Sequence, residues 1–115
     1  MATAIDGLTP PLVWKYFAEI SAIPRGSKNE AAIARYVVQT AKRLGLAAKR
    51  DKAGNVIVRK PASAGREHVP SVCLQGHLDM VCEKTPESRH DFTTDPIELR
   101  RVDGFLMAKI GRAHV

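Results

Sequence analysis

The chain begins with two stretches in which apolar positions recur every three or four residues, the spacing of an amphipathic helix. The first stretch covers residues 12–20 and follows the Thr-Pro-Pro sequence of residues 9–11, a typical helix start. The second follows the Ser-Lys-Asn-Glu sequence of residues 27–30, which matches a capping box. It ends before Gly45, which readily takes the left-handed conformation of a helix end. The pattern therefore predicts two helices.

After Gly45 the pattern changes to short β-forming runs separated by turn residues. Residues 46–50 and 56–58 flank a turn-rich sequence and predict one hairpin. Residues 98–102 and 105–108 flank an Asp-Gly pair and predict a second hairpin.

A continuous apolar run at residues 71–75 is bounded by Pro70 and Gly76, which predicts a short buried strand. We therefore expect an α/β fold in which two helices are followed by part of a mixed β-sheet. A sheet of three or four strands with two helices buries little on its far side. This predicts marginal stability and exposed apolar surface for the chain alone.

The composition fits one soluble globular domain: 115 residues, of which 44% are hydrophobic and 26% charged. Apolar runs fall far short of the roughly 20 residues that span a bilayer. The first residues lack the basic and apolar regions of a signal peptide. Two cysteines, Cys73 and Cys82, make no disulfide framework and suit a reducing compartment. These features predict a cytoplasmic protein without a membrane partner.

The formal net charge is +6, from 18 basic and 12 acidic residues, and this balance permits a nucleic-acid-binding module. The basic residues are scattered, however, and no aromatic ladder for base stacking is interleaved with them. Ordinary solvated surface explains them more simply. A further alternative is an interaction module that docks on a partner through an unfinished sheet edge.

His77 and Asp79 follow directly on the predicted strand, where open α/β sheets place their ligands. An imidazole can bind a metal, and a carboxylate two residues away can hold it in one tautomer. The alternative is a His–Asp pair that satisfies itself at a loop mouth. Cys82 would be a third ligand only in a weak zinc site, because a structural zinc needs four closed ligands. His90 and Asp91 are adjacent but lie in a predicted loop.

The Gly-His-Leu-Asp-Met-Val sequence of residues 76–81 resembles the first metal-binding motif of the co-catalytic zinc peptidases that include aminoacylase and carnosinase. Further stretches narrow this resemblance to the aminoacyl-histidine dipeptidase family, also called Xaa-His dipeptidases or peptidase D. The resemblance covers nearly all of residues 8–109, and its ordered blocks are residues 11–14 with 23–24, 54–62, 74–81 and 90–97.

The resemblance implies a two-domain hydrolase several times longer than this chain. Its catalytic domain is a mixed sheet flanked by helices. Two divalent metals, usually zinc, with manganese or cobalt as alternatives, activate the water that attacks Xaa-His and other dipeptides. By position, His77 resembles a metal ligand and Asp79 the carboxylate that orients it. A cytoplasmic homodimer that acts on dipeptides, with no nucleic-acid or membrane partner, is expected for the full-length enzyme.

The chain departs from the family at its end. The family continues with Gly-Thr-Thr-Leu-Gly-Ala-Asp-Asn-Gly, whose Asp bridges the metals, whereas residues 110–115 read Ile-Gly-Arg-Ala-His-Val. We expect residues 1–109 to be an N-terminal fragment of the catalytic domain. Residues 110–115 are expected to be a non-native tail, because one back-translation matches a sequencing-library adapter. A natural frameshift or alternative end is the other explanation. One ligand and its orienting carboxylate cannot hold two metals, so the fragment alone is expected to be inactive.

Overall fold

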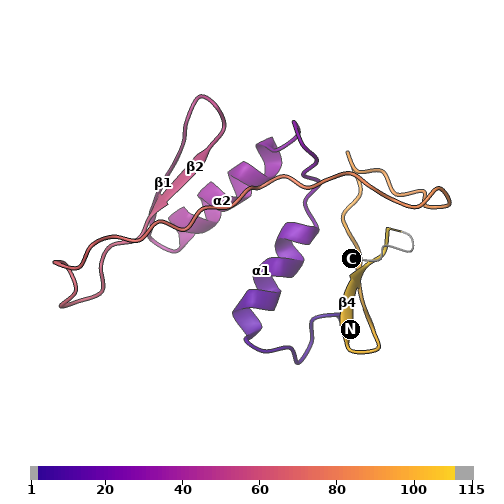
Figure 1. Ribbon diagram of the computed structural model, residues 1–115, viewed down its shortest axis with the longest axis horizontal. Coiled ribbons are helices and arrows are strands. Elements are labelled where there is room, and N and C mark those ends of the chain that lie inside the picture. The colour runs from indigo at the N-terminus through magenta and orange to yellow at the C-terminus, as the bar shows by residue number, and fades with distance from the viewer. Residues whose placement is uncertain (1–2, 111–115) are drawn as a thin grey trace. The chain divides into compact units, whose positions relative to one another are not determined.

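A computed structural model describes residues 3–110, and the chain divides into two compact units. The first unit joins Met1–Asn29 to Asp79–Val115, and the second is Glu30–Leu78. Two helices precede four strands, which pair as two separate two-stranded antiparallel sheets (Figure 1). The predicted α/β class is confirmed. Within the described residues, neither helix is long and apolar enough to cross a membrane.

The second unit contains helix α2 (Ala31–Arg43) and the hairpin of β1 (Ala47–Arg50) and β2 (Val56–Arg59). The helix lies beside the hairpin (Figure 1) and buries the side chains of Ile33, Ala34 and Ala41. In the hairpin, the register places Ala47 opposite Arg59 and Arg50 opposite Val56. The helix and the hairpin were both predicted from the sequence, and both are confirmed.

Helix α2 ends at Arg43, with Leu44 as its C-cap, and so it stops before Gly45 as predicted. Gly45 has a φ of +76°, and its amide donates to the Lys42 carbonyl at 3.0 Å. The Leu46 amide donates to the Ala41 carbonyl at 2.9 Å. These two bonds are those of a Schellman motif, which satisfies carbonyls that the helix leaves without partners.

The first unit contains helix α1 (Pro11–Ser21) and the hairpin of β3 (Leu99–Val102) and β4 (Phe105–Ala108). The two residues between these strands, Asp103 and Gly104, have φ values of +49° and +82°. Positive φ at both positions suits the tight turn that matches strand twist. The second predicted hairpin is therefore confirmed. The Arg101 guanidinium donates to the backbone carbonyl of Ala4 at 2.5 Å and to that of Asp6, which ties β3 to the N-terminal segment.

Two local predictions are wrong. Residues 71–75 form no regular structure, and Val72 and Leu74 are 84% and 93% exposed. An apolar run favours a strand, but a strand also needs a neighbour for its backbone hydrogen bonds, and none pairs with this one within residues 3–110. The capping box is also wrong. The N-cap of α2 is Glu30, with no side-chain cap, and the Ser27 hydroxyl is engaged elsewhere.

Of the predicted tail at residues 110–115, the described part of the chain includes only Ile110, whose side chain is buried. Residues 111–115, with His114 among them, lie outside the described residues.

Candidate metal-binding motif and its support

Asp79 lies where two distant segments of the first unit meet. The Met80 amide donates to the Arg25 carbonyl at 2.9 Å, and Gly26 and Met80 form a parallel β-bridge. Gly26 is buried, and a Cβ placed on it would lie 2.6 Å from the Cys82 sulfur. The missing side chain of Gly26 therefore leaves room for the Cys82 sulfur beside the bridge to Met80.

The Asp79 carboxylate accepts a hydrogen bond from the Ser27 hydroxyl, with 2.5 Å between Oγ and Oδ2. Asp79 is half-buried, and Ser27 is exposed. Because the two residues are 52 positions apart, no local pattern in the sequence could reveal this contact. The predicted capping box assigned the Ser27 hydroxyl to a helix end, so its contact with Asp79 was not predicted.

His77 is exposed and lies on the irregular segment at the end of the second unit. The boundary between the units falls between Leu78 and Asp79, so the two predicted site residues belong to different units. That Asp79 orients His77 stays a prediction, which rests on their two-residue spacing.

His77 and Asp79 offer an imidazole and a carboxylate to a metal ion. An imidazole and a carboxylate are accepted by zinc, manganese and cobalt. A catalytic zinc takes three protein ligands and a structural zinc four. Within residues 3–110, however, no group of three or more His, Cys, Asp and Glu side chains is placed to hold a metal ion. The donor types of His77 and Asp79 therefore suit a metal, but within the described residues they make up only part of the ligands that a metal site needs.

The Cys82 sulfur lies against Gly26, with a contact of 3.9 Å to the Met80 carbonyl. Cys82 as a whole is exposed, with a free thiol. The weak zinc-site reading of Cys82 gains no support from this environment.

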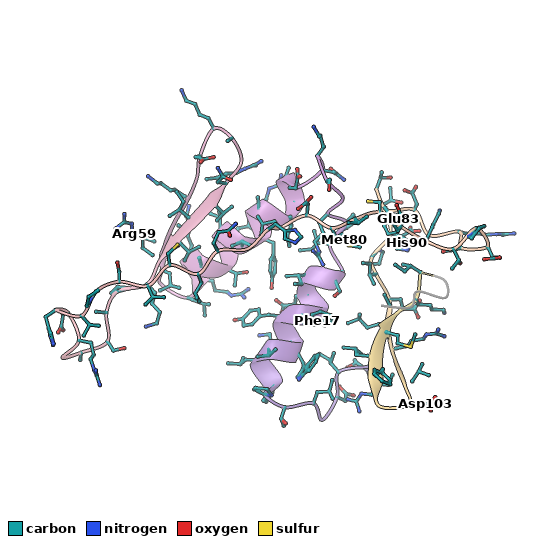
Figure 2. The ribbon with its side chains drawn as sticks, in the orientation of Figure 1. Phe17, Arg59, Met80, Glu83, His90 and Asp103 are labelled. Carbon is teal, nitrogen blue, oxygen red and sulfur yellow. The ribbon has the colours of Figure 1, made fainter. Side chains whose placement is uncertain are left out.

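His90 lies in a loop further along the segment that carries Met80 and Glu83 (Figure 2). Its ring stacks edge-on against Phe92, with 4.6 Å between ring centroids. The Asp91 carboxylate next to it accepts hydrogen bonds from the Thr93 hydroxyl and amide, and these bonds lower the pKa of Asp91. Both residues shape the loop, as the loop prediction implied.

Comparison with known proteins shows the class of this chain. No protein-family model matches it. A curated relative, the cytosol non-specific dipeptidase of Escherichia coli (strain K12), is 47% identical over 94 residues, which are 82% of this chain and 19% of the relative. The crystal structure of the aminoacylhistidine dipeptidase from Vibrio alginolyticus matches with a TM-score of 0.86 and 42% identity, over 91% of this chain and 21% of that one. The chain is thus homologous to dipeptidases, which are hydrolases.

More narrowly, its sequence and fold are similar to part of the aminoacylhistidine dipeptidase from Vibrio alginolyticus, in agreement with the family resemblance of the sequence. The chain spans about a fifth of the length of either relative. A basic nucleic-acid-binding or interaction module is not favoured by these matches.

Proposed function

We propose that this chain carries the first metal-binding motif of a metal-dependent dipeptidase that hydrolyses Xaa-His and other dipeptides. In this proposal His77 is a ligand of one of two divalent metals, and Asp79 orients its imidazole. Zinc is the preferred metal, and manganese and cobalt are alternatives. The observation that carries the proposal is the match to two dipeptidases at 47% and 42% identity.

The bound metals would supply an activated water and a polarised scissile carbonyl. His77 must be neutral to present a lone pair to a metal, with its other ring nitrogen protonated. In this role the Asp79 carboxylate would accept a hydrogen bond from that ring N–H, which would fix the tautomer and make the imidazole a better ligand. Together the two residues provide one oriented ligand.

The 115 residues alone are proposed to be inactive, because one oriented ligand cannot hold a pair of metals. Residues 1–109 are proposed to be the N-terminal fragment of the catalytic domain, and residues 110–115 a non-native tail. The complete enzyme is proposed to be a cytoplasmic homodimer, and the name of the E. coli relative as a cytosol dipeptidase supports the compartment.

The test is a graft in which the aligned stretch of this chain replaces its counterpart in the E. coli dipeptidase. We expect the graft to hydrolyse a His-containing dipeptide, to lose activity to a chelator, and to regain it with zinc, manganese or cobalt. His77→Ala should reduce hydrolysis to background, and Asp79→Asn should lower it about 10- to 100-fold.

His68→Ala is the matched control, since His68 is also exposed and on an irregular segment. It should hydrolyse the dipeptide at the rate of the unchanged graft. Full activity of the His77→Ala graft would overturn the proposed ligand. Metal-supported hydrolysis by the 115-residue chain alone would overturn its proposed inactivity.

A further inference from the structure

The His-x-Asp motif of residues 77–79 does not account for the hydrogen bond between Ser27 and Asp79. We propose that Ser27 is a positioning residue, whose hydroxyl holds the Asp79 carboxylate in the orientation that His77 requires. This inference rests on the proposed function, because Asp79 has a catalytic purpose only if His77 binds a metal.

Backbone contacts lie directly beside the hydrogen bond between the two side chains, and the two sets of contacts support each other. The Arg25 carbonyl accepts a hydrogen bond from the Met80 amide, and Gly26 forms a β-bridge with Met80. The residues that flank Ser27 and Asp79 are therefore in register. All of these residues belong to the first compact unit. The hydroxyl of Ser27 therefore meets a carboxylate whose backbone is held in place on the C-terminal side.

The chemistry of the contact suits a positioning role. A hydroxyl that donates to a carboxylate makes a short, charge-assisted hydrogen bond, and 2.5 Å lies at the short end of the usual range. The terminal torsion of an aspartate is otherwise broad, so a bond to one oxygen restricts the carboxylate plane. A carboxylate has about four lone-pair positions and can accept an imidazole N–H as well.

A purely structural use of Ser27 as a helix cap is excluded by the structure. The N-cap of α2 is Glu30, and no side chain makes a capping hydrogen bond there. The described hydrogen bond of the Ser27 hydroxyl goes to Asp79.

The kinetic test uses the graft into the E. coli dipeptidase. Ser27→Ala should lower kcat about tenfold, the lower end of the range for residues outside the ligand shell, and leave KM unchanged. Ser27→Thr keeps the hydroxyl and should restore kcat. The control Ser63→Ala lies in an exposed loop, where the Ser63 carbonyl accepts a hydrogen bond from the Arg66 amide, and it should behave as the unchanged graft.

A double-mutant cycle separates positioning from general structural damage. If Ser27 acts through Asp79, Ser27→Ala should cause no further loss in a graft that already carries Asp79→Asn. A tenfold loss in both backgrounds would overturn the inference. The inference would also be overturned if the Ser27→Ala graft kept full kcat while the His77→Ala graft was inactive. In that case the proposed function would stand. Activity of the His77→Ala graft would instead overturn the proposed function itself.

A second measurement needs neither the graft nor a metal. In the 115-residue chain, hydrogen exchange of the Met80 amide reports on the bond to Arg25 beside the contact. Ser27→Ala should speed this exchange severalfold, whereas Ser27→Thr and Ser63→Ala should not. An unchanged exchange rate in Ser27→Ala would overturn the contact on which the inference rests.

Discussion

Gly26 and Ser27 are neighbours in the chain, and both contact the segment that begins at Asp79. Gly26 gives the backbone room beside the Cys82 sulfur, and Ser27 bonds to the carboxylate. Gly26 matters because it has no side chain, whereas Ser27 contributes its hydroxyl. The surroundings of Asp79 are thus set in part by residues outside the His-x-Asp motif.

Gly26→Ala should destabilise the first unit by about 1 kcal/mol, the lower end of the cost of overpacking, because its Cβ would lie 2.6 Å from the sulfur of the exposed Cys82 side chain, which must turn aside. Urea unfolding and exchange of the Met80 amide measure this loss. Adding Cys82→Ala removes the sulfur and should restore most of the stability.

Gly76→Ala is the control, since a Cβ there meets no atom within 4 Å. It should leave the unfolding free energy unchanged. If Cys82→Ala gave no rescue of Gly26→Ala, the close approach of the sulfur would not be the cause.

At the scale of elements, local signals specify the helix end and both hairpin turns. In the β1–β2 turn, the Asp51 carboxylate accepts the Asn55 amide through Oδ1 and the Asn55 side-chain NH₂ through Oδ2, each at 2.9 Å. The side-chain bond, and then the backbone bond, lower the pKa of Asp51 below its ordinary value of 3.8. The turn therefore holds the ionised carboxylate.

This turn should loosen in acid. Because the pKa of Asp51 is lowered on folding, its contribution is complete above about pH 5 and is lost as the pH falls below 3.8 through the lowered value. The Asn55 amide proton, followed by NMR, should shift upfield and exchange faster across that range. Asp51→Asn has no charge to lose, so its Asn55 signal should show no such transition. A flat profile in the unchanged chain would contradict the prediction.

At the scale of the whole molecule, the described part of the chain buries few apolar side chains and exposes many. The buried apolar side chains are those of Ile33, Ala34, Ala41 and Ile110. Val72 and Leu74 remain largely exposed, on the segment that was predicted to be a buried strand. Since the chain spans about a fifth of its relatives, marginal stability is expected for it alone.

Leu74→Ser should therefore change the stability of the 115-residue chain by no more than about 0.5 kcal/mol. Ile33→Ala should cost about 2–5 kcal/mol, since Ile33 is 2% exposed, and should reduce the helical circular dichroism signal. Leu74→Ser should also weaken binding of a hydrophobic dye. The unchanged chain should melt broadly, and a sharp cooperative melt would contradict its marginal stability.

The elements that local chemistry encodes were predictable. Gly45 ends a helix and the Asp103–Gly104 pair makes a hairpin turn because the backbone conformation that each position needs is available to those residues themselves. The irregular, exposed course of residues 71–75 was not predictable in this sense, because an apolar run forms a strand only where a partner strand pairs with it. For the proposed site, the residue types and spacing predicted His77 and Asp79, and they gave no sign of Ser27.

The sequence by itself determined the two helices, the two hairpins and the His-x-Asp motif with its family resemblance. Each of these depends on residues close together in the chain, where propensity and spacing act directly. Only the tertiary structure decided that the Ser27 hydroxyl bonds to Asp79 and not to a helix end. It also decided that Gly26 lies against the Cys82 sulfur and that Leu74 is exposed. Those features depend on which distant segments meet, and side-chain contacts over such separations leave no periodic signal.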